Sequence, residues 1–162
     1  VRQTVDQVVA EITCFAETDL LCYRADMPKT LADKQAQAWQ PLLDWLHEEH
    51  GTTLVVTNGV IPVQQSPEQI AVLEKLVAAH DVYALTALYT LVSISGSLVI
   101  GLAVSAGRLD ATAAWVASRI DYDFQAAQWG VDPEAAADSI VTRSDLDAAA
   151  RFLDLARVKT VD

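Results

Sequence analysis

The sequence has 162 residues, of which 52% are hydrophobic, and its 22 acidic against 11 basic side chains give a formal net charge of −11. A chain of this length is expected to form one domain with a sizeable buried core. The negative charge argues against nucleic acid and anionic membrane surfaces as partners, because both attract basic proteins. It fits a partner with a basic or mixed surface, and it also simply keeps a protein soluble.

Two helices are predicted in the first 50 residues, where apolar side chains recur at spacings of three and four. The stripe of the first helix contains Val5, Val8, Val9, Ile12 and Phe15. The second helix is predicted from about residue 31 to 50, with Trp39, Leu42, Leu43 and Leu46 on one face. Pro41 falls inside this pattern and should either kink the helix or mark its true start. Gly51 is expected to end it.

The two cysteines, Cys14 and Cys22, are predicted to be reduced and buried. If both lie on one helix, eight residues separate them by about 12 Å along the axis. A disulfide needs Cα atoms within about 7 Å of each other, so this pair cannot form one. Reduced thiols indicate a reducing compartment.

The hydrophobic pattern changes between residues 53 and 65, where short β-branched segments flank Asn58 and Gly59. Asn-Gly is a strong signal for a tight turn, so we predict a small hairpin or two extended segments here. Pro62 would confine its segment to an edge. Ser66 is then predicted to begin a helix that runs to about residue 79, with Gln69 closing a capping box.

No charged residue lies between Asp81 and Arg108, a stretch long enough to span a bilayer. Threonines, serines and two glycines interrupt it, and no basic cluster flanks it. A helix that is apolar on all sides is also typical of the centre of a helical bundle. We therefore predict a buried core element that Gly96 bends or splits, rather than a membrane span.

The C-terminal third also shows helix signals. Asp110 is expected to cap a helix that continues or breaks near Asp121 and ends at Gly130. The last helical segment begins near Pro133 and reaches about residue 155, in one piece or in two if residues 144–147 re-cap it. Together the elements predict a mainly α fold, an orthogonal-type helical bundle with a small extended or hairpin excursion near residues 53–65.

Two polar strings punctuated by aromatic residues stand at opposite ends of the chain, at residues 17–25 and 118–130. Four further segments lie between and after them, at residues 40–45, 96–99, 107–110 and 148–153. In this order the set resembles the assembly chaperones of the ATP synthase catalytic head, in the branch that binds the α subunit. The resemblance covers nearly the whole chain.

This resemblance implies a molecular chaperone that binds the free α subunit until the β subunit replaces it, in the bacterial cytoplasm or the mitochondrial matrix. It implies no enzyme activity, no cofactor, no small-molecule substrate, no nucleic acid partner and no membrane insertion. Residues 1–162 would be the helical client-binding domain. The family carries a smaller β-rich domain ahead of this part, and because the chain opens at Val1 without an initiator Met we expect that domain to be absent here.

The second string is the sharper candidate for a partner-binding site. Its candidate residues are Asp121, Asp123, Gln125, Gln128 and Trp129. On one helix Asp121, Gln125 and Trp129 share a face, and an exposed Trp beside amides and carboxylates is typical of a protein interface. The alternative is that Trp129 and Phe124 belong to the core and the aspartates to a solvated face. The resemblance favours partner binding, although the family often has a carboxylate where this chain has Ala126 and Ala127.

The first string offers a second candidate, formed by Glu17, Asp19, Tyr23 and Arg24. Glu17 and Arg24 are seven residues apart, two turns of a helix, and could face one partner. The alternative is an internal ion pair with a helix end near Arg24. The pattern does not decide between the two.

No strong catalytic motif is present. The histidines of His47-Glu48-Glu49-His50 are three apart, whereas the HExxH zinc motif needs a spacing of four, so a solvated helix end is favoured. Ser95-Gly96-Ser97 has no following Lys and is not a phosphate loop. A small metal-dependent hydrolase using Asp121, Asp123 and a histidine is the alternative function, and the missing motifs argue against it. We predict no catalytic residue and no metal ligand.

Overall fold

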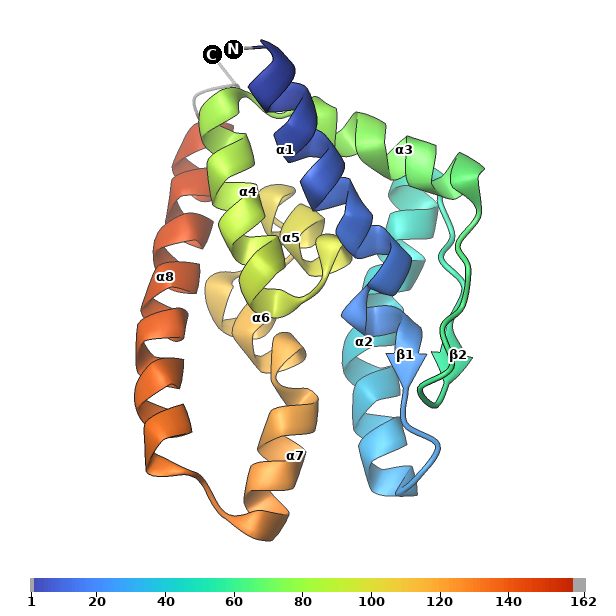
Figure 1. Cartoon of the computed structure of the whole chain (residues 1–162), viewed down its shortest axis with the longest axis vertical. Coiled ribbons are helices and arrows are strands. Elements are labelled where there is room, and N and C mark those ends of the chain that lie inside the picture. Colours follow the sequence, from blue (N-terminus) through green and yellow to red (C-terminus); the bar gives the residue numbers. More distant parts are fainter. Residues whose placement is uncertain (1, 159–162) are drawn as a thin grey trace.

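The computed structural model describes residues 2–158 and consists mainly of α-helices (Figure 1), which confirms the mainly α prediction. The elements in chain order are α1 (Arg2–Cys14), the 3-10 turns η1 (Phe15–Thr18) and η2 (Leu20–Cys22), β1 (Tyr23–Arg24), α2 (Lys29–His50), β2 (Thr57–Asn58), α3 (Pro67–Ala78), α4 (Val82–Ser95), α5 (Leu98–Ser105), α6 (Ala111–Ser118), α7 (Ile120–Trp129) and α8 (Pro133–Val158).

The uncharged stretch after Asp81 forms two helices, α4 and α5, as predicted. The Asp81 carboxylate accepts a hydrogen bond from the Ala84 backbone N–H at 2.8 Å and begins α4. Gly96 ends α4 with a φ of 71°, a left-handed conformation that glycine adopts without steric cost. No helix within residues 2–158 is long and apolar enough to cross a membrane.

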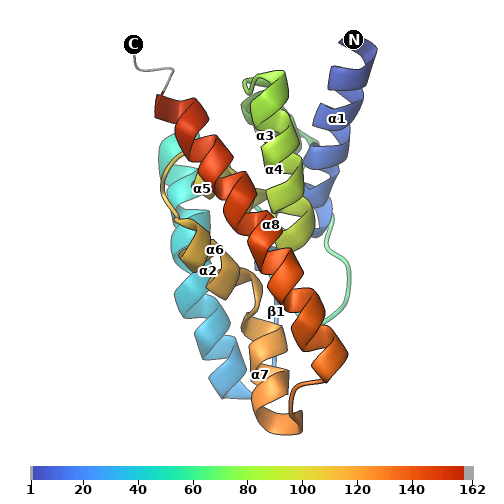
Figure 2. The same cartoon turned by 90° about the vertical axis from the view of Figure 1, so that its left-hand side faces the viewer.

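Helix α5 is the centre of the core, and all of its residues from Leu98 to Val104 are buried. It packs against α2, α4, α6 and α8. Figures 1 and 2 show α8 running the length of the molecule beside α4, while α3 crosses the top at a steep angle. A central helix that is covered on every side explains why its sequence lacks an amphipathic pattern.

Helix α2 passes through Pro41 without ending, so the prediction that Pro41 marks the helix start is wrong. Proline removes one backbone hydrogen bond, to the carbonyl four residues earlier. That carbonyl belongs to Gln37, an exposed residue like Pro41 itself, so water can satisfy it. Gly51 ends the helix as predicted, with a φ of 65°.

Of the two alternatives predicted for residues 53–65, the hairpin is wrong and the extended segment is confirmed. β2 pairs with β1 in parallel, with Tyr23 opposite Thr57 and Arg24 opposite Asn58. The Gly59 N–H continues this pairing by donating to the Arg24 carbonyl at 2.8 Å.

The Gln65 side chain makes the hydrogen bonds to Val55 that a second hairpin strand would otherwise make. The buried amide of Gln65 accepts from the Val55 N–H at 2.8 Å and donates to the Val55 carbonyl at 3.0 Å. Both backbone groups of Val55 are therefore satisfied without a neighbouring strand.

Two further expectations are corrected, the side-chain cap at Ser66 and the burial of Cys14, and one open alternative is decided for α8. Ser66 does precede α3, but its side chain makes no capping bond, and Gln69 instead accepts from the Thr53 N–H at 2.7 Å. Helix α8 is a single helix of 26 residues, the one-piece alternative. Cys14 is exposed, whereas Cys22 is buried as predicted, and both thiols are free.

Gly101 allows α5 and α4 to approach closely, and its replacement is expected to destabilise the fold. A Cβ atom at this position would lie 2.5 Å from Val92 Cγ2 and 3.1 Å from Leu88 Cδ1. Overpacking of this kind costs about 1–3 kcal/mol, which outweighs the gain of up to about 1 kcal/mol from placing Ala in a helix. Urea unfolding of the Gly101→Ala variant should show this loss.

The double variant Gly101→Ala with Val92→Ala supplies the control. Shortening Val92 removes the nearest obstructing atom, so the two changes together should cost less than the sum of the single changes. Additive costs would contradict the close approach as the cause.

Candidate functional site

The second string forms α7 and the turns on either side of it. Helix α6 ends at Ser118, α7 starts at Ile120 with Arg119 between them, and no residue of α7 is buried. Trp129 is 85% exposed, so the interpretation of this ring as a core residue is wrong. Phe124 is only half-buried, and the Lys34 ammonium lies 5.8 Å from its ring centroid.

The candidate residues of α7 do not all point the same way. Successive helix residues are rotated by about 100°, so Asp121, Gln125, Gln128 and Trp129 lie within one broad face, while Asp123 lies nearly opposite Gln125. Gln125, Gln128, Trp129 and Asp123 are exposed, and Asp121 is half-buried. A single flat partner could therefore contact the first group but not Asp123 at the same time.

Arg119 fixes the joint between α6 and α7. Its guanidinium lies 3.7 Å from the ring centroid of Tyr122 and 4.9 Å from that of Trp115. It donates through Nη2 to Ser139 Oγ of α8 at 2.8 Å, while its buried Nε has no hydrogen-bond partner among residues 2–158. Cation–π stacking and this bond together hold the start of α7 against α8.

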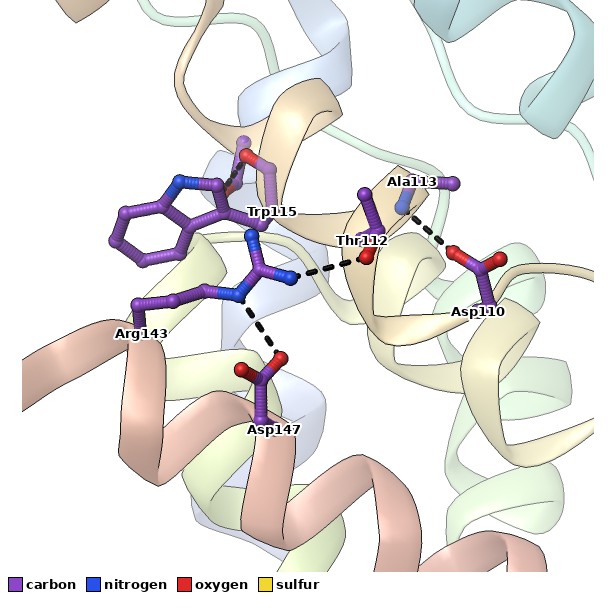
Figure 3. Close-up of polar contacts among 7 residues, drawn as sticks. Asp110, Thr112, Ala113, Trp115, Arg143 and Asp147 are labelled. Atoms are coloured by element: carbon purple, nitrogen blue, oxygen red, sulfur yellow. Dashed lines mark hydrogen bonds and ion pairs between the residues drawn. The ribbon is translucent and has the colours of Figure 1, made fainter. Parts of the chain in front are cut away.

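A second arginine ties α8 to the same tryptophan (Figure 3). Arg143 lies with its guanidinium 5.6 Å from the Trp115 ring centroid. It also donates to Asp147 at 2.9 Å and to the Thr112 hydroxyl at 3.0 Å. Both arginines therefore contact Trp115, Arg119 from the end of α6 and Arg143 from α8.

The first string is not a helix, and two of its four candidates are buried. It runs through η1, η2 and β1, so the helical spacing assumed for Glu17 and Arg24 does not apply. Asp19 is 0% exposed, which corrects the expectation that its carboxylate faces a partner. Glu17 is exposed, and Tyr23 is half-buried with its hydroxyl accepting from the Val63 N–H at 3.3 Å.

The buried Asp19 carboxylate sits at the N-terminus of α5. It accepts hydrogen bonds from Ser97 Oγ at 2.7 Å, Leu21 N at 3.1 Å and Val99 N at 3.1 Å. Burial raises the pKa of Asp19 from 3.8 to about 6, and these hydrogen bonds oppose the rise. The helix N-terminus supplies the N–H groups that a buried carboxylate needs.

Arg24 is also inside the fold, which corrects its placement on a partner-facing surface. Its Nε donates to the Leu21 carbonyl at 2.8 Å and its Nη2 to Gln40 Oε1 at 3.3 Å. The guanidinium lies 5.7 Å from the Trp39 ring centroid. Burial lowers the pKa of Arg24, and within residues 2–158 it forms no ion pair with Glu17 or any other carboxylate.

One buried glutamine that the sequence analysis missed joins the two strings. Gln35 is 2% exposed, and its Oε1 accepts from the Ala25 N–H at 2.7 Å while its Nε2 donates to Asp121 Oδ1 at 2.5 Å. A second link runs beside it, because Trp39 Nε1 donates to the Ala117 carbonyl at 2.8 Å. Gln35 lies four residues before Trp39, in its apolar stripe, and a polar residue at such a position could have revealed it.

Asp121, His47 and His50 are engaged in contacts within the fold. The Asp121 carboxylate already accepts a hydrogen bond from Gln35, and Asp123 points to the other side of α7. Within the described residues no group of three or more His, Cys, Asp or Glu side chains could hold a metal ion. His47 bonds to Thr53 Oγ1 at 3.0 Å, and His50 packs edge-on against Trp45.

Comparison with known proteins identifies the family. The family described as ATP12 chaperone protein matches residues 1–47. The crystal structure of Atp12 from Paracoccus denitrificans is 44% identical, with a TM-score of 0.91 over 94% of this chain. This chain belongs to the ATP12 chaperone family. The Agrobacterium tumefaciens protein Atu1473, described as a candidate chaperone, is 34% identical, with a TM-score of 0.82 over 92% of this chain.

The chain corresponds to only part of these ATP12-type proteins. It spans 66% of the Paracoccus protein and 56% of the Agrobacterium protein. The shared part includes the helical fold described above, since the match to the Paracoccus structure covers 94% of this chain.

Replacing Gln35 should loosen α7. The Gln35→Leu variant keeps the volume but leaves the Ala25 N–H and the Asp121 carboxylate without their partner, which should cost about 2 kcal/mol or more. Urea unfolding should report that loss, and hydrogen exchange should show faster exchange in α7. The exposed Gln37→Leu serves as the matched control. Unchanged protection in α7 would contradict the bridging role of Gln35.

The buried Asp19 should make stability depend on pH in a defined direction. Because its folded pKa of about 6 is above the ordinary 3.8, its contribution is full below about pH 4 and is lost as the pH rises through 6. The shift corresponds to about 3 kcal/mol. Urea unfolding of the parent chain and of Asp19→Asn should therefore diverge as the pH falls from 7 to 4, with the parent gaining stability relative to the variant. Parallel pH profiles would refute the raised pKa.

Proposed function

We propose that this chain acts as a chaperone in assembly of the ATP synthase catalytic head, where it binds the free α subunit until the β subunit replaces it. Family membership over almost the whole chain supports a chaperone role. The observation that carries the choice of surface is α7, a helix without a buried residue that nevertheless is held firmly at its base.

The physical demands of this role match that surface. A subunit awaiting its partner exposes an apolar patch, and exposed patches aggregate. A chaperone must cover such a patch with moderate affinity, because the final partner has to displace it. A large aromatic side chain surrounded by amides provides contact area together with exchangeable hydrogen bonds. Trp129 with Gln125 and Gln128 forms such a surface.

The candidate residues divide into two roles in this proposal. Gln125, Gln128 and Trp129 contact the α subunit directly, with Asp123 and Glu17 exposed on separate flanks. Asp121 is half-buried and bonded to Gln35, so it orients α7. Asp19 and Arg24 hold the first string inside the fold and act on the partner only through the positions of their neighbours.

This role needs no catalytic residue, cofactor, nucleic acid or membrane insertion. We propose that residues 1–162 include the client-binding helical part, and that the chaperone works in the bacterial cytoplasm or the mitochondrial matrix, where the ATP synthase head is assembled. The reduced state proposed for Cys14 and Cys22 is consistent with either compartment.

Co-elution with isolated α subunit on size-exclusion chromatography tests the proposal, with isolated β subunit as the control. A complex with α alone is expected. Trp129→Ala should weaken it at least about tenfold, as loss of a central aromatic anchor does. Val60→Ala is the matched control, because Val60 is 93% exposed but lies far along the chain from α7. Binding to β alone, or to neither subunit, would contradict the proposal.

A further inference from the structure

Helix α8 is apolar on two sides, and only one of them is used by the fold. Its buried side contributes Leu146, Ala149, Ala150 and Leu153 to the core. On the exposed side a second stripe follows spacings of four, three, four and three residues. The stripe consists of Val141, Asp145, Ala148, Phe152 and Leu155. Its large members are well exposed, with Val141 at 63%, Phe152 at 43% and Leu155 at 58%.

The stripe borders a groove against α4. Tyr83, Thr86, Ala87 and Thr90 line the α4 side, and Asp145, Ala148, Ala149 and Phe152 line the α8 side, around a volume of about 490 Å³. Figure 2 shows this side of the molecule, with α8 running obliquely across α4. Three alanines and the two aromatic residues Tyr83 and Phe152 are among its lining residues.

The groove is more apolar than its residue types indicate. The Thr86 hydroxyl donates to the Val82 carbonyl at 3.1 Å, and the Thr90 hydroxyl donates to the Thr86 carbonyl at 3.2 Å. Both hydroxyls are therefore satisfied within α4, and their methyl groups remain for contact. Asp145 is the one charged residue that lines this groove, and within the described residues it forms no ion pair.

We propose that this groove binds an amphipathic helix of the client, with a Lys or Arg of that helix facing Asp145. Alternating spacings of four and three are the pattern of a helix-to-helix seam. An apolar groove between two helices is a recurrent docking site for a third. An unpaired carboxylate in the middle of the seam selects a basic residue on the incoming helix. The inference rests on the proposed function, since it names the part of the α subunit that the groove receives.

Charge also argues against a second copy of this chain as the occupant. In a dimer formed through the stripe, each copy would place an Asp145 carboxylate in the interface. None of the five stripe positions carries a basic residue that could pair with it. The net charge of −11 adds repulsion between whole molecules. A helix from a partner with basic residues avoids both costs.

Two substitutions test the groove without touching α7. Ala148→Trp fills it, and Asp145→Lys reverses its charge, and both positions are exposed, so the fold should tolerate them. Each variant should bind isolated α subunit at least tenfold more weakly, with the unfolding midpoint unchanged. Ile140→Trp, at an exposed position turned away from the groove, controls for the added ring. Glu48→Lys, on exposed α2, controls for the change in net charge. Both controls should bind within about twofold of the parent.

A photo-crosslinking amino acid at position 148 identifies the occupant. The expected product is a crosslink to a helical segment of the α subunit that carries a basic residue within one turn. If the parent binds the α subunit and both groove variants bind it equally well, the groove inference is overturned and the proposed function stands. If the parent does not bind the α subunit, the proposed function itself fails. A parent dimer that Ala148→Trp dissociates would make a second copy the occupant and overturn the inference.

Discussion

The buried carboxylate of Asp19 is the interaction on which the arrangement of the N-terminal half depends. It stands between two parts of the chain, receiving N–H and O–H groups from η2 on one side and from the start of α5 on the other. An uncompensated buried charge would be very costly, so the three donors have to be in place together. The Leu20 N–H bond to the Gly96 carbonyl, at 3.1 Å, reinforces the same junction. The central helix and the first string are thereby positioned as one unit.

Helix α2 connects this junction to α6 and α7. Trp39 packs beneath Arg24 and bonds to α6, and Gln35 joins Ala25 to α7. The two polar strings, which are about a hundred residues apart in sequence, are therefore neighbours that share one supporting helix. Several of their polar side chains, Asp19, Arg24 and Asp121 among them, serve this internal scaffold. The distal end of α7, with Trp129, is among their exposed parts and can contact another protein.

Sequence reasoning succeeded at several helix ends, where structure is decided locally. The caps at Asp81 and Asp110 and the glycine ends at Gly51 and Gly96 were predictable, because each acts within one helical turn. The hairpin prediction was wrong because Thr57 pairs with Tyr23, and no local sequence pattern indicates a pairing between residues so far apart. Asp19 was placed outside for a similar reason, since the Ser97 donor that permits its burial lies 78 residues away. The exposure of Trp129 equally depends on where α7 ends relative to α2 and α8.

The exposed apolar stripe of α8 also lies apart from the residues that hold the fold together. The buried side of α8 already covers α4 and α5, while the second stripe leaves apolar area exposed to water. The interruption by Asp145 and the high net negative charge reduce self-association, which a continuous apolar seam would favour. A chaperone has to keep such a surface available while remaining unassociated itself. An acidic residue within an apolar groove meets both requirements, because it repels copies of the same chain and attracts a basic helix.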